Sequence, residues 1–321
     1  MALLFLYYRN SREKIGGPGR LLRLVKCLGG EVIDTPIANE FISRNLAYYI
    51  FQTFLLLLVT IKNINKVARY NIVVFQPYSL PGSVIALLVK TLQRRRIIVD
   101  DVNFHSILEI LYIRLFNKFI YEIWTSSIYT LSQFAYYFPN GPSIRYIFTP
   151  MLPRSQSSLQ KLNLILFTAS KSFKRYMYIA ELICNVIAKD VPEYKFILVG
   201  PAAENLKNKC KATNVLVLGR VPDTVYFKFL QHAKYLIVFD TADFIYPGGT
   251  LIKIIDALEY QVYPIVSSQF KYTLPFLPSV YSIDEVKSLL SHVTPTLPLN
   301  EILKLYNCKK LRQLLANVKA S

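Results

Sequence analysis

The residues best suited to chemistry lie between positions 246 and 259. Gly248, Gly249 and Thr250 open a segment with helical spacing, Lys253 follows one turn later, and Asp256 lies three residues further along the same face. Amides at a helix start and a lysine can hold a pyrophosphate, and a carboxylate on that face can accept hydrogen bonds from ribose hydroxyls. The stretch therefore predicts a nucleotide site. The alternative is an ordinary capped helix whose Lys253 and Asp256 are simply exposed.

A second glycine-rich loop lies near the start of the chain. Gly16 and Gly17 fall between the first predicted strand and a predicted helix over residues 21–27. Glycines let backbone amides approach a phosphate closely, and the helix dipole favours negative charge there. A turn that needs glycine only for its dihedral angles would look the same.

The elements that must position these loops alternate along the chain. Short β-branched runs are separated by longer amphipathic segments, which is typical of a parallel sheet with crossover helices. We expect strands at residues 3–8, 31–34, 71–75, 97–101, 123–125 and 145–148, and then at 163–167, 195–199, 215–218, 235–239 and 263–266.

A proline- and serine-rich linker at residues 149–158 separates two halves of this α/β pattern. We therefore expect an N-terminal domain over residues 1–152 and a C-terminal domain over 153–321, with a ligand bound in a cleft between them at the carboxyl ends of the strands. The basic stretch 301–319 predicts one or two helices that could pack back onto the first domain.

Four stretches of the C-terminal half carry a resemblance to a known family. Residues 196–201, which include Gly200, are followed by 214–221, 233–238 and 248–268 in the order and spacing of the donor-binding domain of GT-B glycosyltransferases of family 4. The N-terminal half resembles that family only in layout.

The resemblance implies the GT-B fold, with two Rossmann-like domains facing a cleft, and a retaining transfer of a sugar from a nucleotide donor to an acceptor. The donor would lie on the C-terminal domain and the acceptor on the N-terminal one. Family members often have two glutamates separated by seven intervening residues, and here those places hold Gly248 and Asp256. The second place keeps a carboxylate, and the first has lost it.

The same resemblance assigns the groups that neutralise the leaving diphosphate to the loop after the first strand of the C-terminal domain. That loop supplies Lys171 and, for the second cation, Lys174 or Arg175. A solvated helix start would have the same composition. Since lysines can stabilise the charge that develops on the phosphate, no metal and no cofactor is expected, and the sugar nucleotide, of UDP or GDP type, is a substrate.

The resemblance also places a residue near the donor sugar after the fourth strand of the N-terminal domain. Many relatives have a histidine there, whereas this chain has Asn103, with His105 two residues later. Either side chain could face the cleft, and a lone histidine is more often structural.

The formal charge of +18 on 321 residues is divided evenly between the two halves. Such a charge favours anionic partners, namely sugar nucleotides, nucleic acid or an anionic membrane face, although a solvated lysine-rich surface is the plainer explanation. The tyrosines lie within apolar patterns, which indicates core positions and not a nucleic-acid surface. The competing hypotheses are a GT-B protein that binds or modifies nucleic acid and a non-catalytic partner subunit.

Four cysteines, Cys27, Cys184, Cys210 and Cys308, lie far apart in the sequence. Their spacing predicts neither a zinc knuckle nor a redox pair, so we expect a reduced cytoplasmic protein without a structural metal.

Residues 45–61 contain no charge, and residues 54–60 are almost continuously apolar. This run falls short of the ~20 residues that a membrane span requires. We interpret it first as a core helix, second as a helix on a membrane surface and last as a span. Peripheral contact with the inner face of a membrane, and a glycan, protein or lipid-linked acceptor, are therefore among the expectations.

Overall fold

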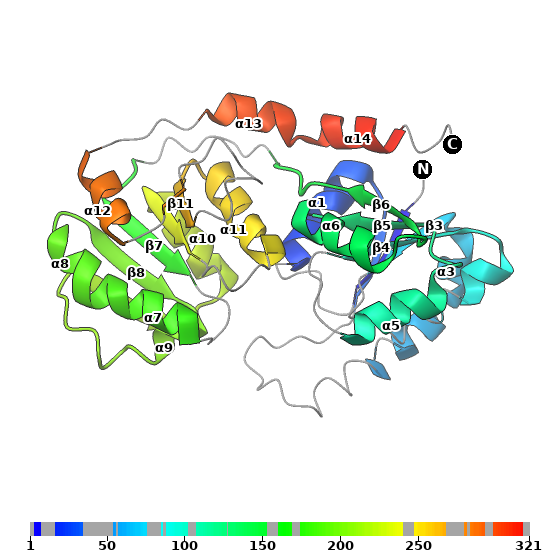
Figure 1. Ribbon diagram of the computed structural model, residues 1–321, viewed down its shortest axis with the longest axis horizontal. Helices are drawn as coiled ribbons and strands as arrows, with labels where there is room; N and C mark the ends of the chain where they lie inside the picture. The colour runs from blue at the N-terminus through cyan, green and yellow to red at the C-terminus, as the bar shows by residue number, and fades with distance from the viewer. Residues whose placement is uncertain are drawn as a thin grey trace. The chain divides into compact units, whose positions relative to one another are not determined.

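The structure is a computed structural model that describes residues 3–7, 17–34, 54–55, 57–75, 85, 88–101, 107–126, 128–152, 160–168, 174–239, 247–267, 279–280, 283–292 and 298–316. The chain divides into two compact units (Figure 1). Unit 1 comprises Met1–Met151, Tyr246–Ile252 and Tyr306–Ser321, and unit 2 comprises Leu152–Ile245 and Lys253–Leu305.

Unit 1 is built on a parallel sheet with the strand order β2-β1-β3-β4-β5-β6. The strands are β1 (Leu3–Tyr7), β2 (Glu31–Asp34), β3 (Ile72–Phe75), β4 (Arg96–Asp101), β5 (Glu122–Thr125) and β6 (Ser143–Tyr146). Valine and isoleucine make up most of β3 and half of β4, because a parallel strand covered on both faces is buried at successive positions.

Alternate residues of this sheet form two apolar faces. One face includes Leu4, Val73, Val99 and Ile123 and is covered by α3 (Ile64–Arg69), α5 (Ile107–Phe116) and α6 (Ile128–Tyr137), together with helical residues 57–62 and 88–92. The side chains that these helices contribute to the cluster include Val67, Ile113 and Phe134.

The opposite face is covered by α1 (Gly17–Leu28) and α14 (Cys308–Ala316). A disulfide joins Cys27 to Cys308, and Arg312 Nε donates to the Cys27 carbonyl at 2.6 Å. Arg145 of β6 donates to the Leu314 carbonyl at 3.1 Å, which fixes α14 to the sheet. The C-terminal helix therefore belongs to unit 1.

Unit 2 has a second parallel sheet with the order β12-β11-β10-β7-β8-β9. Its strands are β7 (Leu164–Thr168), β8 (Lys195–Val199), β9 (Val215–Gly219), β10 (Tyr235–Val238), β11 (Tyr263–Ser267) and β12 (Ser279–Val280). Its helices are α7 (Lys174–Leu182), the π-helical turn η2 (Ile183–Ile187), α8 (Ala188–Asp190), α9 (Pro201–Glu204), α10 (Asp223–His232), α12 (Ile283–His292) and α13 (Leu299–Leu305). Helix α11 (Pro247–Glu259) belongs to unit 2 from Lys253 onward, and its residues up to Ile252 belong to unit 1.

One face of the second sheet packs on α7, η2, α8, α9 and α12. Phe167, Leu198, Ile237 and Ile265 supply the sheet side of this core, and a disulfide between Cys184 and Cys210 lies against it. Strand β7 lies between β10 and β8 in this sheet and contributes to this core. The segment that is predicted to carry the cations follows β7 in the sequence.

The expected α/β fold with two parallel sheets is confirmed, and all eleven predicted strands are present within a few residues of their expected bounds. The two-residue strand β12 was not predicted, because Ser279–Val280 carries no alternating or apolar run. The basic stretch after residue 300 forms the two helices α13 and α14.

The prediction of unpaired, reduced cysteines was wrong. The Cα atoms of Cys27 and Cys308 lie 4.9 Å apart, and those of Cys184 and Cys210 lie 5.4 Å apart. The first pair is separated by 281 residues, so only the packing of α14 on α1 brings the two thiols together. Spacing along a sequence cannot show such a pairing.

The apolar run is helical where the structure describes it, at residues 54–55 and 57–62. Val59 packs against the core, as the interpretation as a core helix requires, whereas Phe54 and Leu58 on the outer side of the helix are exposed. None of the helices in the described part of the chain is long and apolar enough to cross a membrane.

We expect protein that is purified without reductant and then denatured to show no free thiol, and to show four after reduction. The variant Cys184→Ser should show one free thiol, that of Cys210. It should also lose about 3 kcal/mol of unfolding free energy, because the open chain gains entropy in the unfolded state. Four reactive thiols in the unreduced wild type would contradict both pairings.

Candidate functional site

The predicted nucleotide helix begins where the sequence places it. Helix α11 starts at Pro247, a residue whose fixed φ suits the first helical position, and Gly248, Gly249 and Thr250 form its first turn. The surroundings of these three residues are not described by the structure. The amides of this turn have no intrahelical partner, as at any helix start, so the turn can receive an anion.

Lys253, one turn along α11, reaches the carboxyl end of β7. Its side chain is 7% exposed, and Nζ donates to the carbonyl of Thr168 at 3.2 Å. Thr168 is the last residue of β7, directly before the segment that carries Lys171. The structure thus brings Lys253 to the start of the loop from which the diphosphate-neutralising cations are expected.

The cations themselves are described only in part. Lys171 lies outside the described residues, and Lys174 and Arg175 begin α7, with side chains that are not described. Their predicted contact with the leaving diphosphate stays a prediction.

Asp256 lies one turn beyond Lys253 and is fully buried. Because Asp256 is buried, a ribose can reach its carboxylate only if the residues that cover it move when the donor binds. The predicted ribose contact therefore stays a prediction. The next turn carries Glu259, whose Oε1 accepts a hydrogen bond from the Leu152 amide at 2.8 Å. The second half of α11 is therefore held by polar contacts inside unit 2.

Gly200 occupies the turn between β8 and α9 with a φ of 106°, a conformation that favours glycine. Its amide donates to the carbonyl of Gly219 at the end of β9 at 2.6 Å, and Gly219 itself has a φ of 72°. The two glycines join adjacent strands at their carboxyl ends. Because this hydrogen bond uses the Gly200 amide, the residue shapes the loop, and its predicted donor contact stays a prediction.

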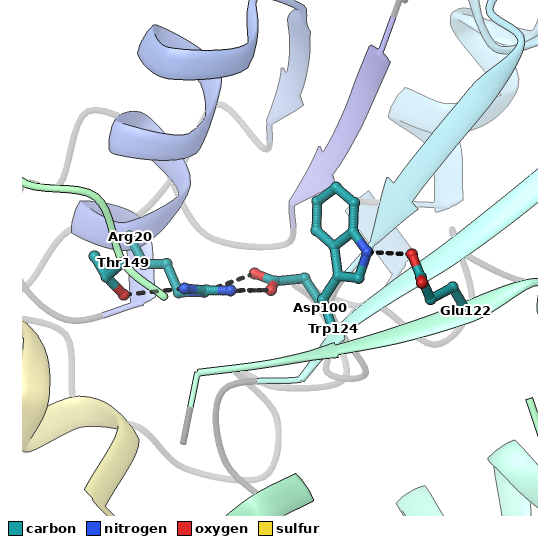
Figure 2. A network of polar contacts seen from close by, with 5 residues as sticks. All are labelled: Arg20, Asp100, Glu122, Trp124 and Thr149. Atoms are coloured by element: carbon teal, nitrogen blue, oxygen red, sulfur yellow. Dashed lines mark hydrogen bonds and ion pairs between the residues drawn. The ribbon is translucent and has the colours of Figure 1, made fainter. Parts of the chain in front are cut away.

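In unit 1 a buried ion pair lies at the carboxyl edge of the sheet (Figure 2). Arg20, in the first turn of α1, donates from Nη2 to Asp100 Oδ1 at 2.7 Å and from Nε to Asp100 Oδ2 at 3.2 Å. Its Nη1 donates to Thr149 Oγ1, after β6, at 3.0 Å. Arg20 is completely buried and Asp100 is 1% exposed, so each charge depends on the other for its compensation.

This ion pair connects two segments that the sequence analysis selected separately. Arg20 lies three residues after Gly17, the first residue of α1, and Asp100 lies near the end of β4, shortly before Asn103 and His105. Gly16, Asn103 and His105 themselves lie outside the described residues. The contact of Arg20 with Asp100 joins α1, which follows Gly16 in the sequence, to β4, which precedes Asn103 and His105.

A second polar contact lies further inside the same sheet and extends to the start of β5. Trp124 pairs in register with Asp100, and its indole Nε1 donates to Glu122 Oε2 at 2.7 Å (Figure 2). Glu122 also accepts from Arg145 Nε at 2.6 Å. Nearby, burial raises the pKa of Tyr146, so this phenol stays protonated and neutral beside Arg20. The polar atoms of Trp124, Glu122 and Arg145 therefore bond to one another within the sheet.

Arg20 and Asp100 were not selected as functional residues from the sequence. Arg20 reads as the end of a glycine loop and Asp100 as the polar end of an apolar strand. The sequence offers one weak signal for this pair. Asp100 is a charged residue at the end of an apolar strand, and the first turn of α1 contains Arg20 but no acidic residue. Among the described residues, no cluster of three or more His, Cys, Asp or Glu side chains could hold a metal ion.

Comparison with known proteins finds likeness in structure alone. No family model and no curated protein matches the sequence. The chain is similar to HepE of Anabaena in complex with UDP, with a TM-score of 0.64 and 12% identity over 100% of both chains. It is also similar to a point mutant of TarM of S. aureus in complex with Fondaparinux, alpha-GlcNAc-glycerol and UDP. Here the TM-score is 0.61 at 13% identity, over 83% of this chain and 59% of TarM.

This is the fold of GT-B glycosyltransferases. The two parallel sheets of units 1 and 2 match it along the whole chain, as the resemblance implied, whereas membership of family 4 stays a prediction. The fold is not confined to transferases, since a structure described as a putative UDP-N-acetylglucosamine 2-epimerase of Listeria monocytogenes is similar with a TM-score of 0.57 at 11% identity, over 99% of this chain and 96% of that one.

We expect Asp100→Asn to lower the free energy of unfolding by about 3 kcal/mol, because the amide keeps the shape of the carboxylate but leaves the Arg20 charge uncompensated. Chemical denaturation of the purified protein measures this loss.

Glu31→Gln provides the matched control, since Glu31 pairs with Lys66 at the surface of the same unit and its loss should leave the midpoint close to that of the wild type. If Asp100→Asn behaves like this control, the buried ion pair does not hold the edge.

Proposed function

We propose that this protein is a glycosyltransferase that takes a sugar from a UDP-sugar, with the donor bound at the carboxyl edge of the sheet of unit 2. The observation that carries the proposal is the contact of Lys253 with Thr168, which joins the nucleotide helix α11 to the last residue of β7. The UDP complexes of HepE and TarM, which share the fold, support UDP over other nucleotides.

The proposed chemistry is a transfer with retention of configuration. The bond between the anomeric carbon and the phosphate oxygen breaks, a new bond forms to the acceptor oxygen, and the proton of the acceptor hydroxyl passes to the leaving phosphate. Negative charge grows on the β-phosphate during this step. Lys253, Lys171, one of Lys174 and Arg175, and the amides at the start of α11 stabilise that charge more in the transition state than in the ground state.

The positive charge of these groups supplies what a metal ion provides in other phosphate sites, so the proposal includes neither a metal nor a cofactor. Asn103 or His105 is proposed as the contact to the donor sugar. Unit 1 is proposed to bind the acceptor, which is a glycan, a protein or a lipid-linked molecule, in a protein that contacts the surface of a membrane. The competing hypotheses, nucleic-acid binding and a non-catalytic subunit, are outcomes of the tests below.

Titration calorimetry with nucleotides tests the donor base and the diphosphate together. We expect UDP to bind more tightly than ADP or GDP, and more tightly than UMP, because UMP lacks the second phosphate that the α11 amides and Lys253 contact. Equal binding of UDP and UMP would contradict a diphosphate site. Binding of duplex DNA that outcompetes every nucleotide would favour the nucleic-acid hypothesis.

Removal of the lysine charge tests the site assignment. Lys253→Met keeps the aliphatic stem and should weaken UDP binding at least tenfold, about 1.4 kcal/mol. The matched control is Lys228→Met, an exposed lysine on α10 of the same unit, which should bind as the wild type does. Wild-type affinity in Lys253→Met, with an unchanged melting temperature, would remove Lys253 from the site.

The products of slow donor hydrolysis distinguish a transferase from its alternatives. With no acceptor added, we expect proton NMR to show free sugar that is released with the anomeric configuration of the donor. Release of the opposite anomer would contradict retention, and a sugar epimerised at C2 would indicate an epimerase. UDP binding without any turnover of a panel of UDP-sugars would indicate the non-catalytic subunit.

A further inference from the structure

One face of unit 1 carries apolar side chains on its outer side as well as its inner side. Helical residues 57–62, α3, residues 88–92 and α5 all pack onto the same side of the sheet, where Val59, Val67, Val89 and Ile113 join one apolar cluster. In Figure 1 α3 and α5 lie over this sheet. The outer sides of these helices therefore form a single surface of unit 1.

The first outer stripe belongs to the uncharged run. Phe54, Leu58 and Ile61 follow one another at helical spacing, and they are 54%, 45% and 48% exposed. A helix on the surface of a globular domain normally places polar residues on this side. Lys62 follows directly and is also exposed.

The second stripe lies on residues 88–92. Leu88 and Leu92, one turn apart, are 56% and 86% exposed, and they precede the exposed arginines Arg94, Arg95 and Arg96. A leucine with most of its surface in water contributes nothing to the core, so its apolar character needs another explanation.

The third stripe lies on and just after α5. Leu111, Leu115 and Phe119 are spaced by four residues and are exposed, Leu115 by 74%. Arg114 and Lys118 lie between them and are exposed as well. Thus each of three helices on this surface combines an apolar outer stripe with cations.

Cations gather at the end of this surface where the strands begin. Lys62, Lys66 and Arg69 line a surface pocket together with Asn63, Asn65, Tyr70 and Glu31. Lys66 and Arg69 precede β3, Arg94 and Arg95 precede β4, and Lys118 precedes β5. In the sequence of the three segments 54–69, 88–96 and 107–120, Glu109 is the only acidic residue.

Hydrogen bonds keep two of the helices in place beside each other. Arg95 Nη1 donates to the carbonyls of Ala68 and Arg69 at the end of α3, at 3.2 and 3.1 Å. Lys90 donates to the Ala68 carbonyl at 3.3 Å and to that of Tyr70. Burial and the charge of Arg95 lower the pKa of Lys90 to about 8. The stripes are therefore presented by a fixed scaffold.

We propose that this surface, the basic apolar face, docks onto a membrane that contains anionic phospholipids. Leucine and phenylalanine side chains on convex helices can enter the boundary between headgroups and acyl chains, while lysines and arginines beside them pair with lipid phosphates. Charge complementarity selects this occupant over a second copy of the chain, because two such faces would repel each other.

The position of the face leaves the other end of unit 1 accessible. The cations lie where β3, β4 and β5 begin, whereas Arg20, Asp100 and Thr149 lie at the carboxyl edge of the same sheet. Docking through the basic apolar face therefore leaves the edge with the predicted site loops uncovered. The inference does not depend on the donor assignment, since it concerns different residues.

Co-sedimentation of the whole chain with vesicles tests the proposal. Vesicles of phosphatidylcholine and phosphatidylglycerol in equal parts should bind the protein, vesicles of phosphatidylcholine alone should not, and added salt should weaken the binding. Equal binding to both vesicles would overturn the anionic selection. Binding to neither kind of vesicle would overturn the proposal that the face docks onto a membrane, and an acidic protein would then be the partner.

Variants then locate the binding surface. Leu92→Glu and Leu115→Glu should each weaken binding at least about tenfold, since each places a charge where an apolar side chain is buried in the bilayer. Lys118→Glu should weaken it at least about fivefold. Because these side chains are largely exposed, melting temperatures should stay near that of the wild type.

The matched control is Leu305→Glu, which makes the same change at a 56% exposed leucine of unit 2 and should bind vesicles as the wild type does. UDP binding, measured without vesicles, should be unchanged in all four variants, so that a failed donor site and a failed membrane surface give different results. Wild-type vesicle binding by Leu92→Glu and Leu115→Glu would overturn the assignment of the face.

Discussion

The parallel direction of every paired strand in both sheets is the constraint on which the rest of the structure depends. Because the strands of each sheet run in the same direction, the segments that follow them begin at one edge of the sheet, and the segments that precede them end at the other edge. In unit 2 Thr168, the last residue of β7, accepts a hydrogen bond from Lys253 of α11, and in unit 1 Asp100, near the end of β4, pairs with Arg20 of α1. In unit 1 the cations of the outer helices collect at the opposite edge.

The two edges of the sheet of unit 1 differ in how their charges are compensated. At the carboxyl edge Arg20 and Asp100 are buried and bonded to each other, so they contribute order and no net field. At the amino edge arginines and lysines are exposed and outnumber acidic groups. One edge is suited to positioning loops, and the other is suited to attracting an anionic surface. Part of the net charge of +18 is thus located at the amino edge of this sheet.

Sequence patterns predicted the strands well because fully buried parallel strands require continuous apolar runs, as in Ile72–Phe75 and in the last four residues of Lys195–Val199. The start of α11 was also predictable, because proline and two glycines mark it. Contacts over long separations were not predictable: the Cys27–Cys308 pair and the Arg20–Asp100 pair depend on which helix packs on which sheet face. The exposure of Leu58 and Leu92 likewise depends on packing, since an apolar run predicts a core position equally well.

The central claim is that the start of α11 and Lys253 hold the diphosphate of a nucleotide donor. A crystal structure of the protein with UDP tests it most directly. We predict that the β-phosphate lies within hydrogen-bond distance of Lys253 Nζ and of amides in the first turn of α11, with Lys171 on its other side. Ordered UDP at any other place in unit 2, or a first turn of α11 that is covered by protein side chains in the complex, would contradict the account.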